Sequence, residues 1–214
     1  MYVDLGLSVK WATCNVGGID PEDYGDYFAW GEIETYYEPG YAQEDPQAHW
    51  KSGKTGYDWP TYKWGDITYG WIEDKYDIKK YNNNREYGVV DNKEVLDPED
   101  DVAHVKWGGN WRIPTPDEQG ELCTNCTWIW TTINGINGYL ITSNVPGYTD
   151  RSIFIPAAGD RSGTILSGIG DCGAYWSNRL MWPHSGYLLQ FNDHACLWGN
   201  TGRNDGRTVR PVCP

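Results

Sequence analysis

The stretch that decides the fold is AYWSNRLMWPHSGYLLQF at residues 174–191, followed by TVRPV at residues 208–212. Apolar and polar residues alternate here over short runs, and proline, glycine and serine interrupt them. Alternation over about four to eight residues between such breakers is typical of half-buried strands. We therefore predict strands at 174–177, 186–191, 196–198 and 208–212.

The same pattern extends upstream. It predicts further strands at residues 2–15 (one or two strands), 26–31, 127–133, 139–142 and 151–156. The pairs Asn134-Gly135 and Asn137-Gly138 are turn signals, because Asn and Gly tolerate the positive φ that tight turns need. Most of the chain is therefore expected to be β-structure with frequent turns.

Two short helices are predicted. Asp97 stands at an N-cap position and is followed by proline and two acids, which favours a helix over residues 98–106. Thr115 and Glu118 have the spacing of a capping box, which predicts a second helix from residue 116 to about residue 123.

The composition matches this class. The chain has 13 Trp, 16 Tyr and only 3 Phe, with 26 Gly and 12 Pro, so long helices have little room. Residues 34–92 lack clean periodicity, and we interpret them as a loop-rich insertion packed by its own aromatic residues. No internal repeat is visible, so residues 1–214 are expected to form a single α+β domain.

Charge narrows the list of partners. The chain carries 17 Lys and Arg against 30 Asp and Glu, a net charge of −13. This surface repels nucleic acids and anionic membranes, so neither is an expected partner. No apolar run approaches the roughly 20 residues of a membrane span, so we expect no membrane insertion by this domain. We expect an export signal, and an anchoring domain or pilus subunit, to lie outside these residues.

The six cysteines leave several arrangements open. They are Cys14, Cys123, Cys126, Cys172, Cys196 and Cys213. The C-x-x-C spacing of Cys123 and Cys126 lacks the second pair of a zinc ribbon and the βαβ context of a redox motif. We interpret the cysteines as buried thiols or structural disulfides, whose pairing cannot be deduced from sequence.

Seven ordered blocks resemble the Fib-succ-major paralogous domain family of gut bacterial surface proteins. They are YVDLGL (2–7), WATCNVG (11–17), PEDYGDYFAWGE (21–32), WRIPT (111–115), FIPAAG (154–159), YWS (175–177) and VRPV (209–212). The resemblance implies a C-type-lectin-like fold, in the branch shared with formylglycine-generating enzymes. Such a fold would contain mostly short antiparallel strands, two short helices and long loops. It also implies an extracellular or cell-surface location.

The tail also resembles the variable proteins of diversity-generating retroelements. In those proteins, adenine-directed mutagenesis rewrites Asn codons within a frame that here is Tyr175-Trp176-Ser177, Phe191-Asn192, Trp198, Arg203 and 209–212. Changes in the first two bases of an Asn codon cannot give Trp, Met or Gln. Those types therefore mark fixed positions, here Trp176, Met181, Trp182, Gln190 and Trp198.

The resemblance implies a ligand-binding face between these fixed positions. Trp176 and Trp198 are expected in the core with Leu189, Phe191 and Val209, whereas Trp182 and Tyr187 are expected to be exposed. Aromatic anchors beside small polar groups are typical of recognition surfaces. The predicted ligand-binding residues are Asn178, Leu180, Trp182, His184, Tyr187, Leu188, His194, Cys196, Leu197, Gly199, Asn200, Thr201, Gly202 and Asn204.

We expect no enzymatic activity. Formylglycine-generating enzymes use a pair of cysteines in the C-terminal half, and the flanks of Cys172 and Cys196 do not match that pattern. In a strand, His194 would share a face with Cys196 and could activate its thiol. We therefore keep a formylglycine-generating-type oxidase as an alternative function.

No cofactor is expected, with calcium as the alternative. Asp160, Asp171 and Asp205 lie in glycine-rich loops and offer oxygen ligands of the kind Ca²⁺ prefers. Asp beside Gly is also ordinary turn chemistry. The Glu-Pro-Asn and Gln-Pro-Asp triplets of sugar-binding C-type lectins are absent from the sequence.

These observations lead to one functional expectation. The chain is expected to be a surface-displayed, adhesin- or receptor-type domain that binds a protein or glycan through a diversified C-terminal region. A structural or adhesive domain of the same family without diversification is the alternative.

Overall fold

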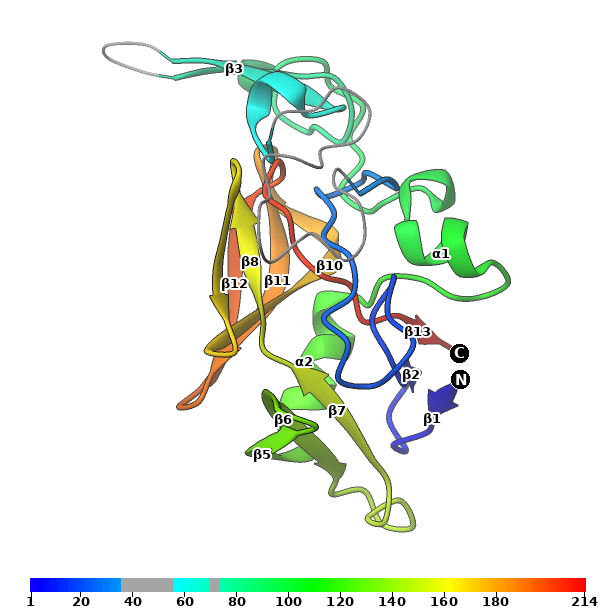
Figure 1. Ribbon diagram of the computed structural model, residues 1–214. Coiled ribbons are helices and arrows are strands. Elements are labelled where there is room, and N and C mark those ends of the chain that lie inside the picture. Colours follow the sequence, from blue (N-terminus) through cyan, green and yellow to red (C-terminus); the bar gives the residue numbers. More distant parts are fainter. Residues whose placement is uncertain (36–55, 70–73) are drawn as a thin grey trace.

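The computed structural model describes residues 1–35, 56–69 and 74–214. The main sheet has the strand order β12-β11-β10-β8-β9 and occupies one side of the molecule (Figure 1). Its strands are β8 (Ala158–Ser162), β9 (Ile165–Ile169), β10 (Cys172–Trp182), β11 (Ser185–Asn192) and β12 (Cys196–Gly202). The pairings are antiparallel except that between β10 and β8. The strands predicted at 174–177, 186–191 and 196–198 are confirmed, and each is longer than predicted.

A second sheet is the antiparallel meander β5 (Cys126–Ile133), β6 (Ile136–Ser143) and β7 (Ser152–Pro156), which lies below the main sheet in Figure 1. Asn134 and Gly135 form the predicted two-residue turn, with φ of 49° and 85°. The turn predicted at Asn137-Gly138 is wrong, because both residues lie inside β6. A Cβ on Gly138 would come within 2.4 Å of the Ile155 carbonyl oxygen, so glycine permits close approach of β7 there.

The two ends of the chain meet in a third sheet, of order β1-β2-β13. It consists of β1 (Tyr2–Val3), β2 (Lys10–Ala12) and β13 (Val212–Cys213), and both termini lie beside it (Figure 1). The strands predicted at 26–31 and 208–212 are mostly extended chain. Phe28 bridges Arg207, and Thr208 bridges Tyr175, without forming longer ladders.

The second helix was predicted more accurately than the first. In α2 (Pro116–Thr124), Thr115 and Glu118 form the complete capping box. The first predicted helix is divided into a 3₁₀ turn, η3 (Pro98–Asp100), and α1 (Val102–Trp107). Asp101 caps α1 by accepting hydrogen bonds from Ala103 and His104, whereas Asp97 makes no side-chain cap.

The described part of the predicted insertion has regular structure, while residues 36–55 and 70–73 lie outside the described residues. It contains η1 (Trp59–Thr61), η2 (Arg85–Tyr87) and the hairpin of β3 (Gly65–Thr68) and β4 (Lys75–Ile78), above the main sheet in Figure 1. One apolar cluster joins this segment to the body of the protein. Its buried members are Tyr27, Ala29, Tyr57, Trp59, Tyr62, Ile67 and Ile78.

Two further apolar clusters form the core of the body. One packs Leu122 of α2 with Tyr175, Leu189 and Phe191 of the main sheet. The other packs Trp176 against Trp30. The indole of Trp176 donates a hydrogen bond to the Phe28 carbonyl at 2.7 Å, so a Trp here fills the core and also pairs a backbone group.

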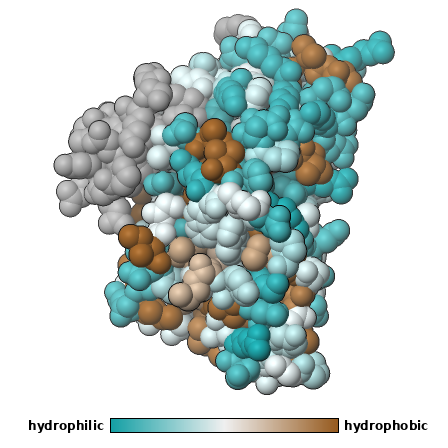
Figure 2. Space-filling model, turned by 90° about the vertical axis from the view of Figure 1, so that its right-hand side faces the viewer, coloured by the Kyte–Doolittle hydropathy of each residue, from teal (hydrophilic) through white to brown (hydrophobic). Residues whose placement is uncertain are grey.

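The molecular surface is mainly polar on the side that carries α1. Figure 2 shows small hydrophobic patches there, separated by hydrophilic residues. Among the helices of the described residues, none combines the length and apolar character that crossing a membrane requires.

Candidate functional site

The predicted ligand-binding residues lie on three neighbouring strands at one edge of the main sheet. β12 is the edge strand, and β11 pairs with it from Ser185↔Gly202 to Phe191↔Cys196. Burial divides the residues into three sets. The exposed set is Trp182, His194, Leu197 and Asn200. The half-buried set is His184, Tyr187, Cys196, Gly199, Thr201 and Gly202. The buried set is Asn178, Leu180, Leu188 and Asn204.

The expectation that the buried set faces a ligand is wrong. Leu180 and Leu188 belong to the apolar cluster around Trp176 and are 6% and 2% exposed. The backbone of Asn178 exchanges hydrogen bonds with flanking loops, and the Asn204 side chain donates to the Tyr57 carbonyl at 3.1 Å. Leu180, Leu188 and Asn204 therefore support the fold through their side chains, and Asn178 does so through its backbone.

Trp198 departs from its prediction in the opposite direction. Trp176, Leu189, Phe191 and Val209 are buried as expected, but Trp198 is 59% exposed. It stands on the edge strand β12, and its ring covers Gly120 of α2. An edge strand has no neighbour to cover its outer side chains, so the same residue type that fills the core in β10 is exposed in β12.

Large apolar side chains are therefore exposed at both ends of the β11–β12 ladder. Leu197 (57%) and Trp198 lie at one end, opposite Gln190 and Leu189. Trp182 (56%) lies at the other end, where β10 meets β11. Four residues of strand separate the two ends, or roughly 14 Å. Near the first end, a cavity of about 250 Å³ is lined by Leu197 and its neighbours.

The turn between β10 and β11 is fixed to the insertion by a buried arginine. Arg203 donates to the Pro183 carbonyl at 2.8 Å and to the Tyr81 carbonyl at 3.1 Å. It also donates to the Lys80 carbonyl and to the Tyr62 hydroxyl, each at 2.9 Å. A guanidinium satisfies several acceptors in fixed directions, so it holds this turn in one position.

His184, at the tip of this turn, stacks with two tyrosines of the insertion. Its ring centroid is 5.0 Å from that of Tyr76 in β4 and 5.4 Å from that of Tyr87 in η2, with interplanar angles of 27° and 16°. The two tyrosine rings are 5.5 Å apart. We name these three residues the aromatic triad. It brings together segments of the chain that are distant in sequence.

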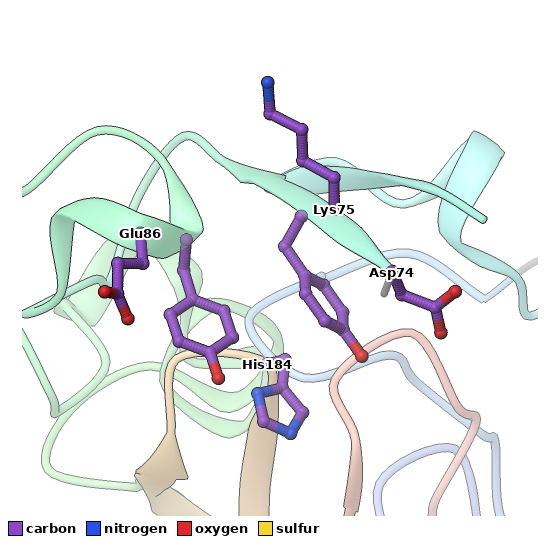
Figure 3. Close-up of a pocket in the computed structure, with 6 residues that line it drawn as sticks. Asp74, Lys75, Glu86 and His184 are labelled. Carbon is purple, nitrogen blue, oxygen red and sulfur yellow. The ribbon is translucent and has the colours of Figure 1, made fainter. Parts of the chain in front are cut away.

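The aromatic triad lines an open cavity of about 810 Å³. Among the described residues, Asp74, Lys75 and Glu86 also line it. In Figure 3, Asp74 and Glu86 lie on opposite sides of His184, and Lys75 points away from it. The cavity therefore has aromatic walls between two carboxylates, in a chain with a net charge of −13.

The electrostatic setting keeps His184 neutral. Burial and, secondarily, the positive charge of Arg203 lower the pKa of His184 below its ordinary value. Burial and the charge of Asp74 raise the pKa of Tyr76. The Nδ1 atom of His184 is buried and has no hydrogen-bond partner among the described residues. Such an atom ordinarily has a partner, which a ligand or a water molecule would supply.

Two of the three residues considered for calcium, Asp160 and Asp205, are engaged in ion pairs, whereas Asp171 is exposed. Asp160 and Asp205 both contact the Arg207 guanidinium, at 3.5 and 3.3 Å. Among the described residues, Asp97, Glu99 and Asp100 form a group with metal-ligand spacing. The Lys80 ammonium lies 2.7, 3.7 and 2.6 Å from these three carboxylates, so a lysine already supplies positive charge there.

The pairing of His194 with Cys196, which the alternative function requires, does not form. His194 lies in the turn before β12, its side chain is 83% exposed, and it contacts Asp193. The Cys196 sulfur contacts the sulfur of Cys123 in α2 instead, at 2.8 Å.

The sequence did not reveal Asp74, Tyr76, Glu86 and Tyr87 as site residues. The available signal was the density of aromatic and acidic residues in the insertion, which has no periodicity to orient them. Their role depends on the contact with His184, which only the folded chain creates. Comparison with protein-family models, with curated proteins and with solved structures finds no match to this chain.

Proposed function

We propose that this chain is a ligand-binding domain, displayed at the cell surface on a C-type-lectin-like fold, that binds a protein ligand through a basic side chain. The observation that carries the proposal is the aromatic triad of His184, Tyr76 and Tyr87 at an open cavity between two carboxylates. Short strands, two short helices and converging chain ends are compatible with the proposed fold.

The chemistry of the cavity favours a cationic group. Arg and Lys side chains are attracted to aromatic rings and to carboxylates, and the cavity offers both. The acidic surface would also steer a basic partner toward the molecule. A neutral histidine adds no repelling charge near pH 7.

The exposed apolar side chains favour a protein over a glycan as the ligand. Trp182 and Trp198 are exposed roughly 14 Å apart along the strands, and Leu197 is exposed on the opposite face of β12 from Trp198. Large aromatic residues of this kind dominate the binding energy of protein interfaces. Together with the cavity, they would provide several anchor points for one polypeptide.

The proposal also restricts where variation is tolerated. Exposed positions such as His194, Leu197 and Asn200 can change without loss of packing. The buried positions Asn178, Leu180, Leu188 and Asn204 cannot. A retroelement template near the gene, differing from it at adenines of exposed positions only, is the expected genomic signature. Absence of any such copy would leave a binding domain without diversification.

The experiment is a screen of the purified chain on two arrays, one of peptides with and without Arg and Lys and one of glycans. Binding to basic peptides is expected, with affinity that falls as salt rises. Tyr87→Ala and Glu86→Gln should each weaken it at least tenfold. Val105→Ala, at an exposed position on α1, serves as the control and should bind like the wild type. Binding to glycans alone, or peptide binding that survives both cavity variants, would refute the proposal.

A further inference from the structure

The thiols of Cys123 and Cys196 face each other across two elements of the fold. Their sulfur atoms are 2.8 Å apart, although the residues are separated by 73 positions in the sequence. Cys123 lies in the last turn of α2, and Cys196 is the first residue of the edge strand β12. Both residues are half-buried.

A second contact shows that this approach is part of the packing of β12 on α2. Trp198 covers Gly120, whose added Cβ would lie 2.9 Å from the indole. Cys196 and Trp198 are two residues apart on a strand, so they share a face. Gly120 and Cys123 are three residues apart on a helix, so they also share a face. Strand and helix therefore run alongside each other, and the two cysteines occupy matching positions.

We propose that Cys123 and Cys196 form a disulfide bond that fastens the edge strand β12 to helix α2. A disulfide bond is about 2.0 Å long, so the sulfurs need to approach by less than 1 Å. A metal site is the alternative explanation for two close thiols. The group with metal-ligand spacing among the described residues is Asp97, Glu99 and Asp100, and it includes neither cysteine. A structural zinc ion takes four ligands, so two thiols alone fit a disulfide better than a zinc site.

The competing partner in the C-x-x-C motif is less suitable. Cys126 is 7% exposed, whereas Cys123 and Cys196 are half-buried, so an oxidant in solution reaches the Cys126 thiol least readily. The pKa of Cys123 is lowered by its hydrogen bond with Cys196. Because the thiolate is the reactive form, Cys123 is the attacking group and Cys196 its partner.

The oxidant is the disulfide of a small molecule or of another protein. Oxidised glutathione serves as the probe. The Cys123 thiolate attacks one glutathione sulfur, the glutathione disulfide breaks, and the first glutathione leaves as a thiolate. The Cys196 thiolate then attacks the Cys123 sulfur and releases the second glutathione. The two protons lost by the protein thiols are taken up by the two leaving thiolates. Two electrons pass from the protein to glutathione.

The test is disulfide mapping of the native chain. The protein is incubated with oxidised glutathione, remaining thiols are alkylated at low pH, and the unreduced digest is analysed by mass spectrometry. We expect a linked Cys123–Cys196 peptide as the main product and a free-thiol count that falls by two. Alkylation of both cysteines in folded, oxidised protein, or a Cys123–Cys126 link in its place, would overturn the proposal.

Two variants give the control. Cys123→Ser should remove the linked peptide and leave Cys196 open to alkylation, whereas Cys213→Ser, at a half-buried position in β13, should leave the link intact. Near-ultraviolet circular dichroism reports whether each variant is folded. If Cys123→Ser does not fold, the wild-type map alone decides. The outcome is independent of which ligand the domain binds.

Discussion

The imidazole of His184 stacks on the phenol ring of Tyr76, with centroids 5.0 Å apart and planes 27° apart. This contact joins the β10–β11 turn to the hairpin of the insertion. It extends the candidate site from the C-terminal strands to a segment that the sequence alone did not include in it. The cavity owes its aromatic wall to both parts of the chain, so the insertion has a direct role in the proposed binding.

Stability should depend on the protonation of His184. Its pKa is lower in the folded chain than the value of about 6.5 expected in the unfolded chain. Between these two values the unfolded chain binds more protons, so stability falls as the pH drops below about 6.5 and is regained above it. Urea unfolding at several pH values should show this decline in the wild type and a shallower one in His184→Gln. His194→Gln, at an exposed histidine, should behave like the wild type; equal slopes in all three proteins would contradict the assignment.

The two tryptophans of the tail should differ sharply in their effect on stability. Trp176 is 1% exposed and bonds the Phe28 carbonyl, so Trp176→Ala should cost about 3–5 kcal/mol of unfolding free energy. Trp198 is 59% exposed, and Trp198→Ala should cost no more than about 1 kcal/mol. Chemical denaturation of both variants measures the difference. Similar losses would mean that Trp198 is packed as a core residue.

Arg203 should not be replaceable by lysine. Its guanidinium serves four acceptors, those of Tyr62, Lys80, Tyr81 and Pro183, in fixed directions. An ammonium cannot reach all of them, and each buried acceptor left unpaired costs about 1–3 kcal/mol. We expect Arg203→Lys to lower the unfolding free energy by about 2–3 kcal/mol. Arg151→Lys, at a partly exposed arginine, is the control and should change it by less than about 0.5 kcal/mol.

Features governed by neighbouring residues were predictable from the sequence. The capping box at Thr115 and Glu118 formed as expected, since both of its hydrogen bonds lie within one helical turn. The Asn134-Gly135 turn formed because these residues accept positive φ. The short apolar runs located β10 and β11 because both strands pack against the core, β10 with six consecutive buried residues. In each case the deciding interaction is short in sequence, or is the burial of a short apolar run.

Features governed by distant neighbours were not predictable in the same way. Asn137-Gly138 has the composition of a turn, but β7 pairs with it and holds it in a strand. Trp198 is a large aromatic residue of the kind expected in a core, but it lies on β12, the edge strand of the main sheet. The cavity needs residues of β4 and η2 beside His184, and no local pattern specifies that contact. The missing information in all three cases is which element lies next to which.

The packing of β12 on α2 can be measured with a double-mutant cycle at Gly120 and Trp198. Gly120 lies inside a helix, where alanine is favoured by about 1 kcal/mol. Its added Cβ would lie 2.9 Å from the Trp198 ring, so in the wild type the indole must move and part of that gain is lost. In a Trp198→Ala background the obstacle is gone, and Gly120→Ala should stabilise by the full amount. The unfolding free energies of the four proteins should give a coupling of at least about 0.5 kcal/mol. Coupling near zero would show that strand and helix do not touch at this point, and would weaken the case for the neighbouring Cys123–Cys196 bond as well.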